Sequence, residues 1–134
     1  MGTNSEGRSG AGLAEYAVKH WGFKYGVAHG PCGQCYGLVT KNLTAGFTDT
    51  VTGVTYMKEG YQSLSRVAIE RHIRTLYEYA SLNPDLDFYI PYRIQRWTNG
   101  RERRSLCGYT GTHLRIMFMC ETPPNNIVFH ESFK

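Results

Sequence analysis

The clearest pattern in this sequence is a helical one between about Leu64 and Leu82. Apolar residues recur there every three or four positions, as expected of a helix with one buried face. Ser63 or Ser65 is suited to cap the first turn, and Asn83-Pro84-Asp85 ends the helix because proline cannot continue its hydrogen bonds. The apolar stripe consists of Leu64, Val67, Ile69, Ile73, Leu76, Tyr77 and Ala80.

Weaker patterns predict two further helices and three strands. The polar stretch 42–60, rich in threonine and glycine, is typical of a loop or hairpin, with an irregular strand over 51–56. The order helix, strand, helix, strand, helix, strand predicts an α/β protein. The further helices are expected over 13–21 and 112–121, and the strands over 35–40, 88–92 and 127–129.

Length and composition indicate one folded domain spanning 1–134. Hydrophobic residues make up 41% of the chain and charged residues 19%, which excludes a disordered chain, and glycine has no collagen-like period. The sequence has neither an apolar run long enough for a membrane span nor a signal peptide, so we expect a cytoplasmic protein with no membrane partner.

Two cysteines, Cys32 and Cys35, have the CxxC spacing of some metal and redox sites. The residues after Cys35 are typical of a strand, whereas a thioredoxin-like motif has a helix there. The other two cysteines, Cys107 and Cys120, are too far apart to supply the second ligand pair of a zinc site. We therefore expect free thiols, no metal and no cofactor.

Two glycine-rich loops each precede an expected helix. They are Gly7–Gly12 and Cys107–Gly111. Such loops bind anions, because the first N–H groups of the helix point toward the ligand. Neither loop is a P-loop, since no Gly-Lys-Ser/Thr occurs. Tyr25 and Tyr109 are suited to stack on a base, although tyrosines in such places more often pack in the core.

The net charge of +4 is concentrated in one segment, where five arginines fall within twelve residues. This concentration favours a phosphate-bearing ligand, and a solvated basic loop is the alternative. Tyr92 and Trp97 interleave with the arginines, so the segment 93–104 is also a candidate for binding RNA or single-stranded DNA. The five are Arg93, Arg96, Arg101, Arg103 and Arg104.

The chain resembles a family of small phage-encoded proteins that are similar to macro domains. Residues 2–14 follow the pattern G-S/T-N-x-x-G-R-H-G-x-G-A-A, residues 21–26 follow F/W-G-A-x-Y-G, and residues 30–41 follow G-L-x-G-Q-S-Y-A-I-P-T-K. The order of these motifs along the chain is also that of the family. Further matches are Tyr79–Leu86, Gly108–Thr110, Met117-Phe118 and Pro124–Val128.

The resemblance implies a three-layer α/β/α macro-domain-like sheet that binds ADP-ribose or a related nucleotide, cyclic ones included. By position, Asn4 is the ribose contact, and the glycine loops hold the diphosphate. The implied ligand-binding set is Asn4, Arg8, Gly10, Gly12, Gln34, Tyr36, Lys41, Arg103, Arg104, Gly108, Tyr109 and Thr110.

Three departures from the family pattern change these expectations. The family has an apolar strand before its first motif, so we expect this domain to lack its usual first strand, or to take one from a second copy in a homo-oligomer. Ser9 stands where histidine is usual. The segment Arg101–Leu106, part of an insertion, replaces the family's G-C-G-x-A-G-Y turn, so we expect its arginines to supply the charge.

Three functions follow as hypotheses. The first is a phage protein in the infected bacterial cytoplasm that sequesters a nucleotide signal of a defence system. The second is a hydrolase that removes ADP-ribose from protein or nucleic acid, for which no catalytic residue can be assigned. The third is the nucleic-acid binder described above. The ionisable residues considered for hydrolysis are Glu6, Asp49, Glu59 and His113.

Overall fold

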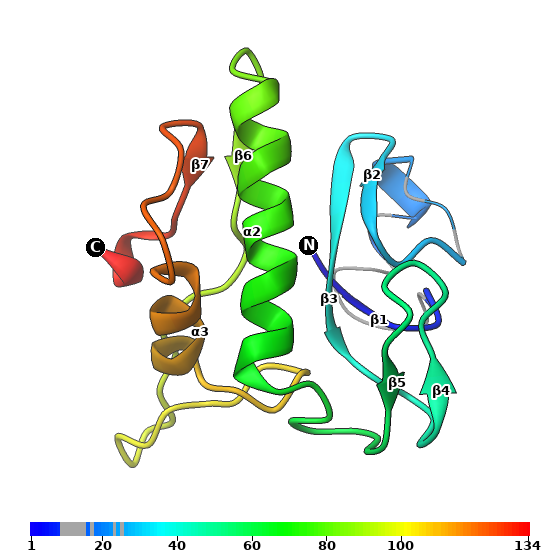
Figure 1. Ribbon diagram of the computed structural model, residues 1–134. Coiled ribbons are helices and arrows are strands. Elements are labelled where there is room, and N and C mark those ends of the chain that lie inside the picture. The colour runs from blue at the N-terminus through cyan, green and yellow to red at the C-terminus, as the bar shows by residue number, and fades with distance from the viewer. Residues whose placement is uncertain (9–15, 17, 23, 25) are drawn as a thin grey trace. The chain divides into compact units, whose positions relative to one another are not determined.

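The computed structural model describes residues 1–8, 16, 18–22, 24 and 26–134 (Figure 1). These residues form two compact units, Met1–Ser65 (unit 1) and Arg66–Lys134 (unit 2), and each is described by itself. Helices and small sheets occur together, which confirms a mixed α/β fold, while the three-layer macro-domain arrangement stays a prediction. Within the described part of the chain, no helix is long and apolar enough to cross a membrane.

Unit 1 is built on a sheet of three strands, β1 (Gly2–Asn4), β2 (Gly30–Cys32) and β3 (Cys35–Lys41). The central strand β3 pairs in parallel with β1 and antiparallel with β2. Residues 37–40 of β3 are buried, so the strand expected over 35–40 is confirmed and carries the core of this sheet. The strand β1 lies within the first motif and precedes the first glycine-rich loop, and the absence of the family's earlier strand stays a prediction.

The CxxC segment is the tight turn between β2 and β3. Cys32 and Cys35 face each other across the two strands, and both thiols are free. Gly33 has a φ of +59°, and a Cβ there would lie 2.6 Å from the carbonyl oxygens of Trp21 and Gly22. Glycine is therefore required at this turn. Of the first expected helix, residues 16 and 18–20 are helical, and the rest of 13–20 lies outside the described residues.

The stretch 42–60 forms the expected hairpin, in which β4 (Phe47–Thr48) pairs antiparallel with β5 (Thr55–Tyr56). The strand expected over 51–56 is confirmed only at its end, because β5 begins at Thr55. Asp49 turns the chain there, because its carboxylate accepts from the Val51 N–H at 2.9 Å and its carbonyl from Gly53 at 2.7 Å.

Unit 2 contains the long helix α2 (Arg66–Leu82), which confirms the strongest prediction. It begins two residues later than expected, and Ser65 immediately precedes it, whereas Ser63 accepts a hydrogen bond from the Asn42 N–H. Val67 was wrongly placed in the stripe, since it is 65% exposed. The buried face consists of Ile69, His72, Ile73, Leu76, Tyr77 and Ala80.

The second helix of this unit, α3 (Gly111–Phe118), lies against α2 (Figure 1). Their contact includes a short hydrogen bond of 2.5 Å from the Tyr77 hydroxyl to the Phe118 carbonyl. This helix ends three residues before the expected Glu121, because the Met119 N–H already donates to carbonyls of the last turn. Leu114, Met117 and Phe118 are fully buried.

Two short strands and a 3-10 turn complete unit 2. The strands β6 (Phe88–Tyr89) and β7 (Ile127–Val128) pair in parallel, and η1 (Glu131–Phe133) ends on a buried phenylalanine. Both strands are shorter than expected. After β6, the Ile90 N–H still donates to the Val128 carbonyl oxygen, and the pairing stops there because Pro91 has no N–H to donate.

A distant asparagine completes the carboxyl end of α2. The Asn126 amide nitrogen lies 2.9 Å from the Ala80 carbonyl oxygen, 3.1 Å from that of Asn83 and 2.8 Å from that of Leu86. The last carbonyls of a helix have no partner within the helix, so they need such an external donor. Asn126 thus stabilises the helix that begins the unit.

Candidate functional site

The parallel pair β1 and β3 ends at one edge of the sheet of unit 1. Asn4 is the last residue of β1 and Lys41 the last of β3, and the two are partners in the strand register. In open α/β sheets, ligands bind outside the carboxyl ends of parallel strands. The residues of this edge, 4–8 and 41–44, are therefore our candidate site, called the carboxyl edge below.

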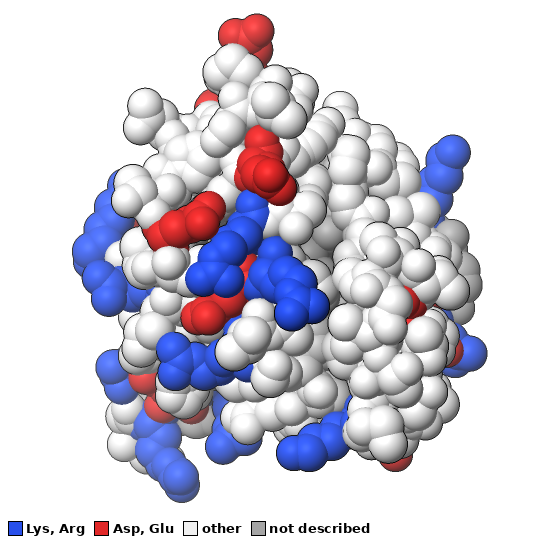
Figure 2. All heavy atoms as spheres, viewed as in Figure 1, with Lys and Arg blue, Asp and Glu red and all other residues white. Residues whose placement is uncertain are grey.

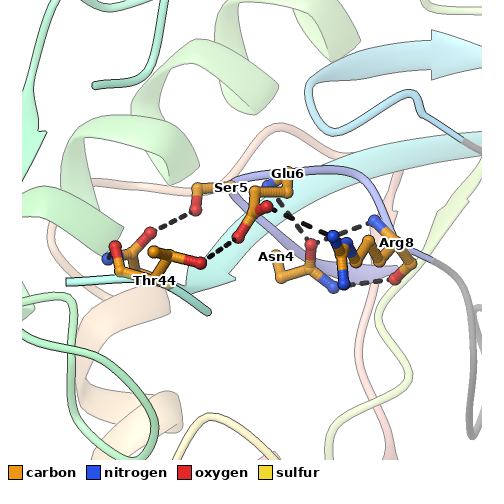
Figure 3. A network of polar contacts seen from close by, with 6 residues as sticks. Asn4, Ser5, Glu6, Arg8 and Thr44 are labelled. Atoms are coloured by element: carbon orange, nitrogen blue, oxygen red, sulfur yellow. Dashed lines mark hydrogen bonds and ion pairs between the residues drawn. The ribbon is translucent and has the colours of Figure 1, made fainter. Parts of the chain in front are cut away.

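Asn4 organises the loop that follows β1 (Figure 3). Its Oδ1 accepts hydrogen bonds from the N–H groups of Glu6 at 3.2 Å and Arg8 at 3.0 Å. Its Nδ2 donates to the Arg8 carbonyl oxygen at 2.7 Å. The carboxamide predicted to contact a ribose therefore holds residues 4–8 in a tight turn.

Two charged side chains of opposite sign lie on this turn. The Arg8 Nε is 3.8 Å from Glu6 Oε1, and the Thr44 hydroxyl donates to Glu6 Oε2 at 2.9 Å. The Glu6 side chain is only 18% exposed, whereas that of Arg8 is 64% exposed. The carboxylate is thus held from two sides, and the guanidinium remains open to a ligand. Thr44 was not anticipated, because no motif marks it.

A fully buried asparagine, Asn42, supports this turn from within. Its Oδ1 accepts from the Ser5 hydroxyl at 2.5 Å, and its Nδ2 donates to the carbonyls of Thr44 and Lys58 at 2.8 Å each. The Ser5 N–H also donates to the Lys41 carbonyl oxygen at 2.8 Å. The loop, the end of β3 and the 42–60 hairpin therefore meet at one side chain.

Gly7 is required by a close backbone approach. Its φ is +68°, and a Cβ would lie 2.5 Å from the carbonyl carbon of Gly26, whose N–H donates to the Gly7 carbonyl oxygen at 2.8 Å. This glycine therefore serves the fold of the loop. Gly10 and Gly12, which the resemblance assigns to phosphate binding, lie outside the described residues.

The remaining candidates of unit 1 divide between the two ends of β3. Lys41 lies at the carboxyl edge, with its Nζ 5.5 Å from the centroid of the Tyr61 ring. Gln34 and Tyr36 lie in the turn before β3 and near its start. The structure thus brings Asn4, Arg8 and Lys41 together and leaves Gln34 and Tyr36 at the opposite end of the strand.

The second glycine-rich loop lies in unit 2 as a tight turn before α3. Gly108, with a φ of +92°, donates its N–H to the Ser105 carbonyl, and Thr110 caps the helix by accepting from the His113 N–H at 3.2 Å. Tyr109 is only 8% exposed, and its ring lies edge-on to His113. Its ring is therefore part of the core, which is the more frequent of the two alternatives considered for this tyrosine.

The amino end of α3, expected to bind phosphate, holds a carboxylate of the protein itself. Glu102 accepts from the Thr112 N–H at 3.0 Å and from the Thr112 hydroxyl at 2.8 Å. Burial raises the pKa of Glu102, but the hydrogen bonds from Thr112 and the charge of Arg96 outweigh it, so the pKa lies below its usual value. An anionic ligand would have to displace this carboxylate.

The arginine-rich segment is an ordered hairpin, called the arginine hairpin below (residues 93–104). The Trp97 N–H donates to the Arg101 carbonyl and the Arg103 N–H to the Gln95 carbonyl, both at 2.8 Å, and Arg96 pairs with Glu102 between them. Figure 2 shows Lys and Arg side chains in the lower left of the view, where Figure 1 draws this segment in yellow. Arg103 and Arg104 therefore belong to a defined surface.

The acidic and histidine side chains considered for hydrolysis are scattered. Asp49 is buried and pairs with His29 at 2.5 Å. Burial raises the pKa of Asp49, but the hydrogen bonds from His29 and the Val51 N–H and the charge of His29 outweigh it, leaving the pKa below its usual value. Glu59 and His113 are exposed, so Glu6 is the acidic group that lies at the carboxyl edge.

Comparisons with protein-family models, with curated proteins and with solved structures gave no match to this chain.

Proposed function

We propose that the protein binds an ADP-ribose-like nucleotide at the carboxyl edge of β1 and β3. The observation that carries this proposal is that Asn4 and Lys41 are register partners at the ends of two parallel strands, with Arg8 in the turn that Asn4 holds. Arg8 and Lys41 supply positive charge for a diphosphate, and the motif resemblance supports the same ligand class. The role we propose with it is sequestration of a nucleotide signal during phage infection.

Thermal unfolding with and without ADP-ribose, beside a panel of cyclic nucleotides, tests the proposal. A ligand at 100 times its dissociation constant adds about 2.7 kcal/mol to the free energy of unfolding. For a domain of this size, that stabilisation raises the melting temperature by about 10 °C. A panel that produces no shift in the folded protein would contradict nucleotide binding.

Variants locate the ligand. We expect Arg8→Ala and Lys41→Ala each to reduce the ligand-induced shift, since each removes a positive charge from the carboxyl edge. Lys24→Ala is the matched control, because it removes the same charge far from the carboxyl edge. The Lys24 N–H donates to Cys32 Sγ, and Cys32 pairs with Cys35 at the start of β3. Equal losses in all three variants would mean that overall charge, and not this edge, determines binding.

Hydrolysis at the same edge is a second candidate function, favoured by Glu6. Thr44 and Arg8 position this carboxylate at the site, and a positioned carboxylate can act as a general base toward a water molecule. Glu6→Gln would then abolish release of ADP-ribose from a modified substrate while preserving the ligand-induced shift. If wild-type protein binds without turnover, the function is binding alone.

A further inference from the structure

The outer face of the arginine hairpin combines positive charge with an exposed aromatic ring. Alternate residues of a β-ribbon point to opposite faces, so Gln95, Trp97, Arg101 and Arg103 share one face, and Arg96 and Glu102 share the other. Glu102 bonds to Thr112, which directs its face toward α3. The face with Trp97 therefore points away from α3.

Charge on the two faces is distributed unequally. Glu102 is the only acidic residue between 93 and 104, and it is the residue held against α3. Among the described residues, no ion pair involves any of the five arginines of the hairpin. Arg93, Arg101 and Arg103 are exposed, so their charge is open to an anionic partner.

Trp97 adds an exposed flat ring to this surface. The Arg103 guanidinium lies over its ring, 4.4 Å from the centroid, and yet 54% of the residue is exposed. A tryptophan with one face covered by arginine presents the other for stacking. Tyr92, the aromatic residue just before the hairpin, is half-buried, and its ring lies 6.0 Å from that of the buried Phe118.

The base of the hairpin is held rigidly. A Cβ at Gly111 would lie 2.4 Å from the Arg93 carbonyl oxygen, so the hairpin meets the first turn of α3 at closest approach. The Ile94 N–H donates to the Ser132 hydroxyl at 2.9 Å, and Arg104 pairs with Thr110. A platform already ordered loses little conformational entropy on binding.

We propose that the outer face of the arginine hairpin binds single-stranded nucleic acid, with a base stacked on Trp97 and phosphates on Arg101 and Arg103. A duplex hides its base faces within the stack, whereas a single strand exposes them. This inference concerns unit 2 and is independent of the nucleotide site proposed in unit 1.

Fluorescence anisotropy of labelled oligouridine of about 12 nucleotides tests the proposal with the full chain. We expect Trp97→Ala to weaken binding about tenfold, because a stacked base is lost. We expect Arg101→Gln to lower the slope of log affinity against log salt by about 0.7 between about 50 and 200 mM salt, the value for one phosphate contact of a single strand.

Matched controls are Trp21→Ala, the other tryptophan, and Arg71→Gln, an exposed arginine of α2. Both should bind as the wild type does, and circular dichroism should give the same folded spectrum for all four variants. Binding of oligothymidine in place of oligouridine also supports the proposal and shows that the ribose 2′-hydroxyl is not required.

Three results would overturn the proposal. The first is no binding of either single strand at low salt. The second is unchanged affinity in Trp97→Ala and Arg101→Gln. The third is equal competition by a duplex or by polyglutamate, which would mean that the surface takes any polyanion, an acidic protein included. None of these results bears on the Arg8 and Lys41 variants, so the two proposals fail separately.

Discussion

Replacing Asn42 tests whether one buried carboxamide joins the parts of unit 1. The side chain makes three hydrogen bonds, one accepted from Ser5 and two donated to the carbonyls of Thr44 and Lys58. Each such bond contributes about 1 kcal/mol net, so Asn42→Ala should lower the free energy of unfolding by about 3 kcal/mol. Ser5→Ala removes only one of the three and should cost about 1 kcal/mol.

The isosteric variant Asn42→Asp gives the sharper result. A carboxylate keeps the size and the acceptor but places negative oxygen against two carbonyls, and a buried unpaired charge costs about 4 kcal/mol. The penalty should shrink on acidification, because this carboxyl group would have a folded-state pKa above the ordinary value of about 3.9. Its protonated form can again donate to one carbonyl, so the loss is full above the folded pKa and relieved below it.

Urea denaturation at pH 7 and at about pH 4 measures these differences. The expected order of destabilisation at pH 7 is Asn42→Asp, then Asn42→Ala, then Ser5→Ala. Asn125→Asp, at an exposed position, is the control and should change stability by less than about 0.5 kcal/mol. An Asn42→Asp protein as stable as the wild type would refute the hydrogen-bond assignment and the rigidity of the carboxyl edge.

Two further predictions concern the arginine hairpin and the dependence of stability on pH. Gly111→Ala places a methyl group against the backbone of residues 93–94 and should lower stability by about 1–3 kcal/mol in urea denaturation, whereas an unchanged midpoint would contradict the close approach. Asp49 has a lowered folded-state pKa, so its stabilisation is present above about pH 3.9 and is lost as the pH falls through the lowered value. Asp49→Asn should therefore be less stable at neutral pH and lose less stability on acidification, and parallel pH profiles for the two proteins would argue against this assignment.

Hydrophobic periodicity predicted the elements that residues close together in the sequence determine. The stripe from Ile69 to Ala80 and the proline after α2 fix that helix, and the threonine- and glycine-rich stretch does form a hairpin. Strand lengths were overestimated where a turn or a proline ends the ladder, as at Asp49 and Pro91. The ends of the strands depend on hydrogen bonds between particular backbone groups, and the pattern of hydrophobic residues carries no information about those bonds.

The candidate sites were predictable in part. The motif resemblance selected Asn4, Arg8 and Lys41, and the strand register brings Asn4 and Lys41 together. The contacts of Asn42 and of Glu102 with Thr112 join residues from different segments, so no spacing in the sequence indicates them. The prediction of a phosphate site at the amino end of α3 did not anticipate that the Glu102 carboxylate binds there.

The cap that Asn126 places on α2 has a consequence for synthesis of the chain. The strand β7, which pairs with β6, and the Asn126 amide that completes α2 become available only after residues 126–128 have been translated. The strand pairings of Met1–Ser65, in contrast, are all internal to that segment. Contacts between distant residues form later than local ones. We therefore expect folding on the ribosome to proceed from the amino-terminal unit, with the carboxyl end of α2 left uncapped until Asn126 has been translated.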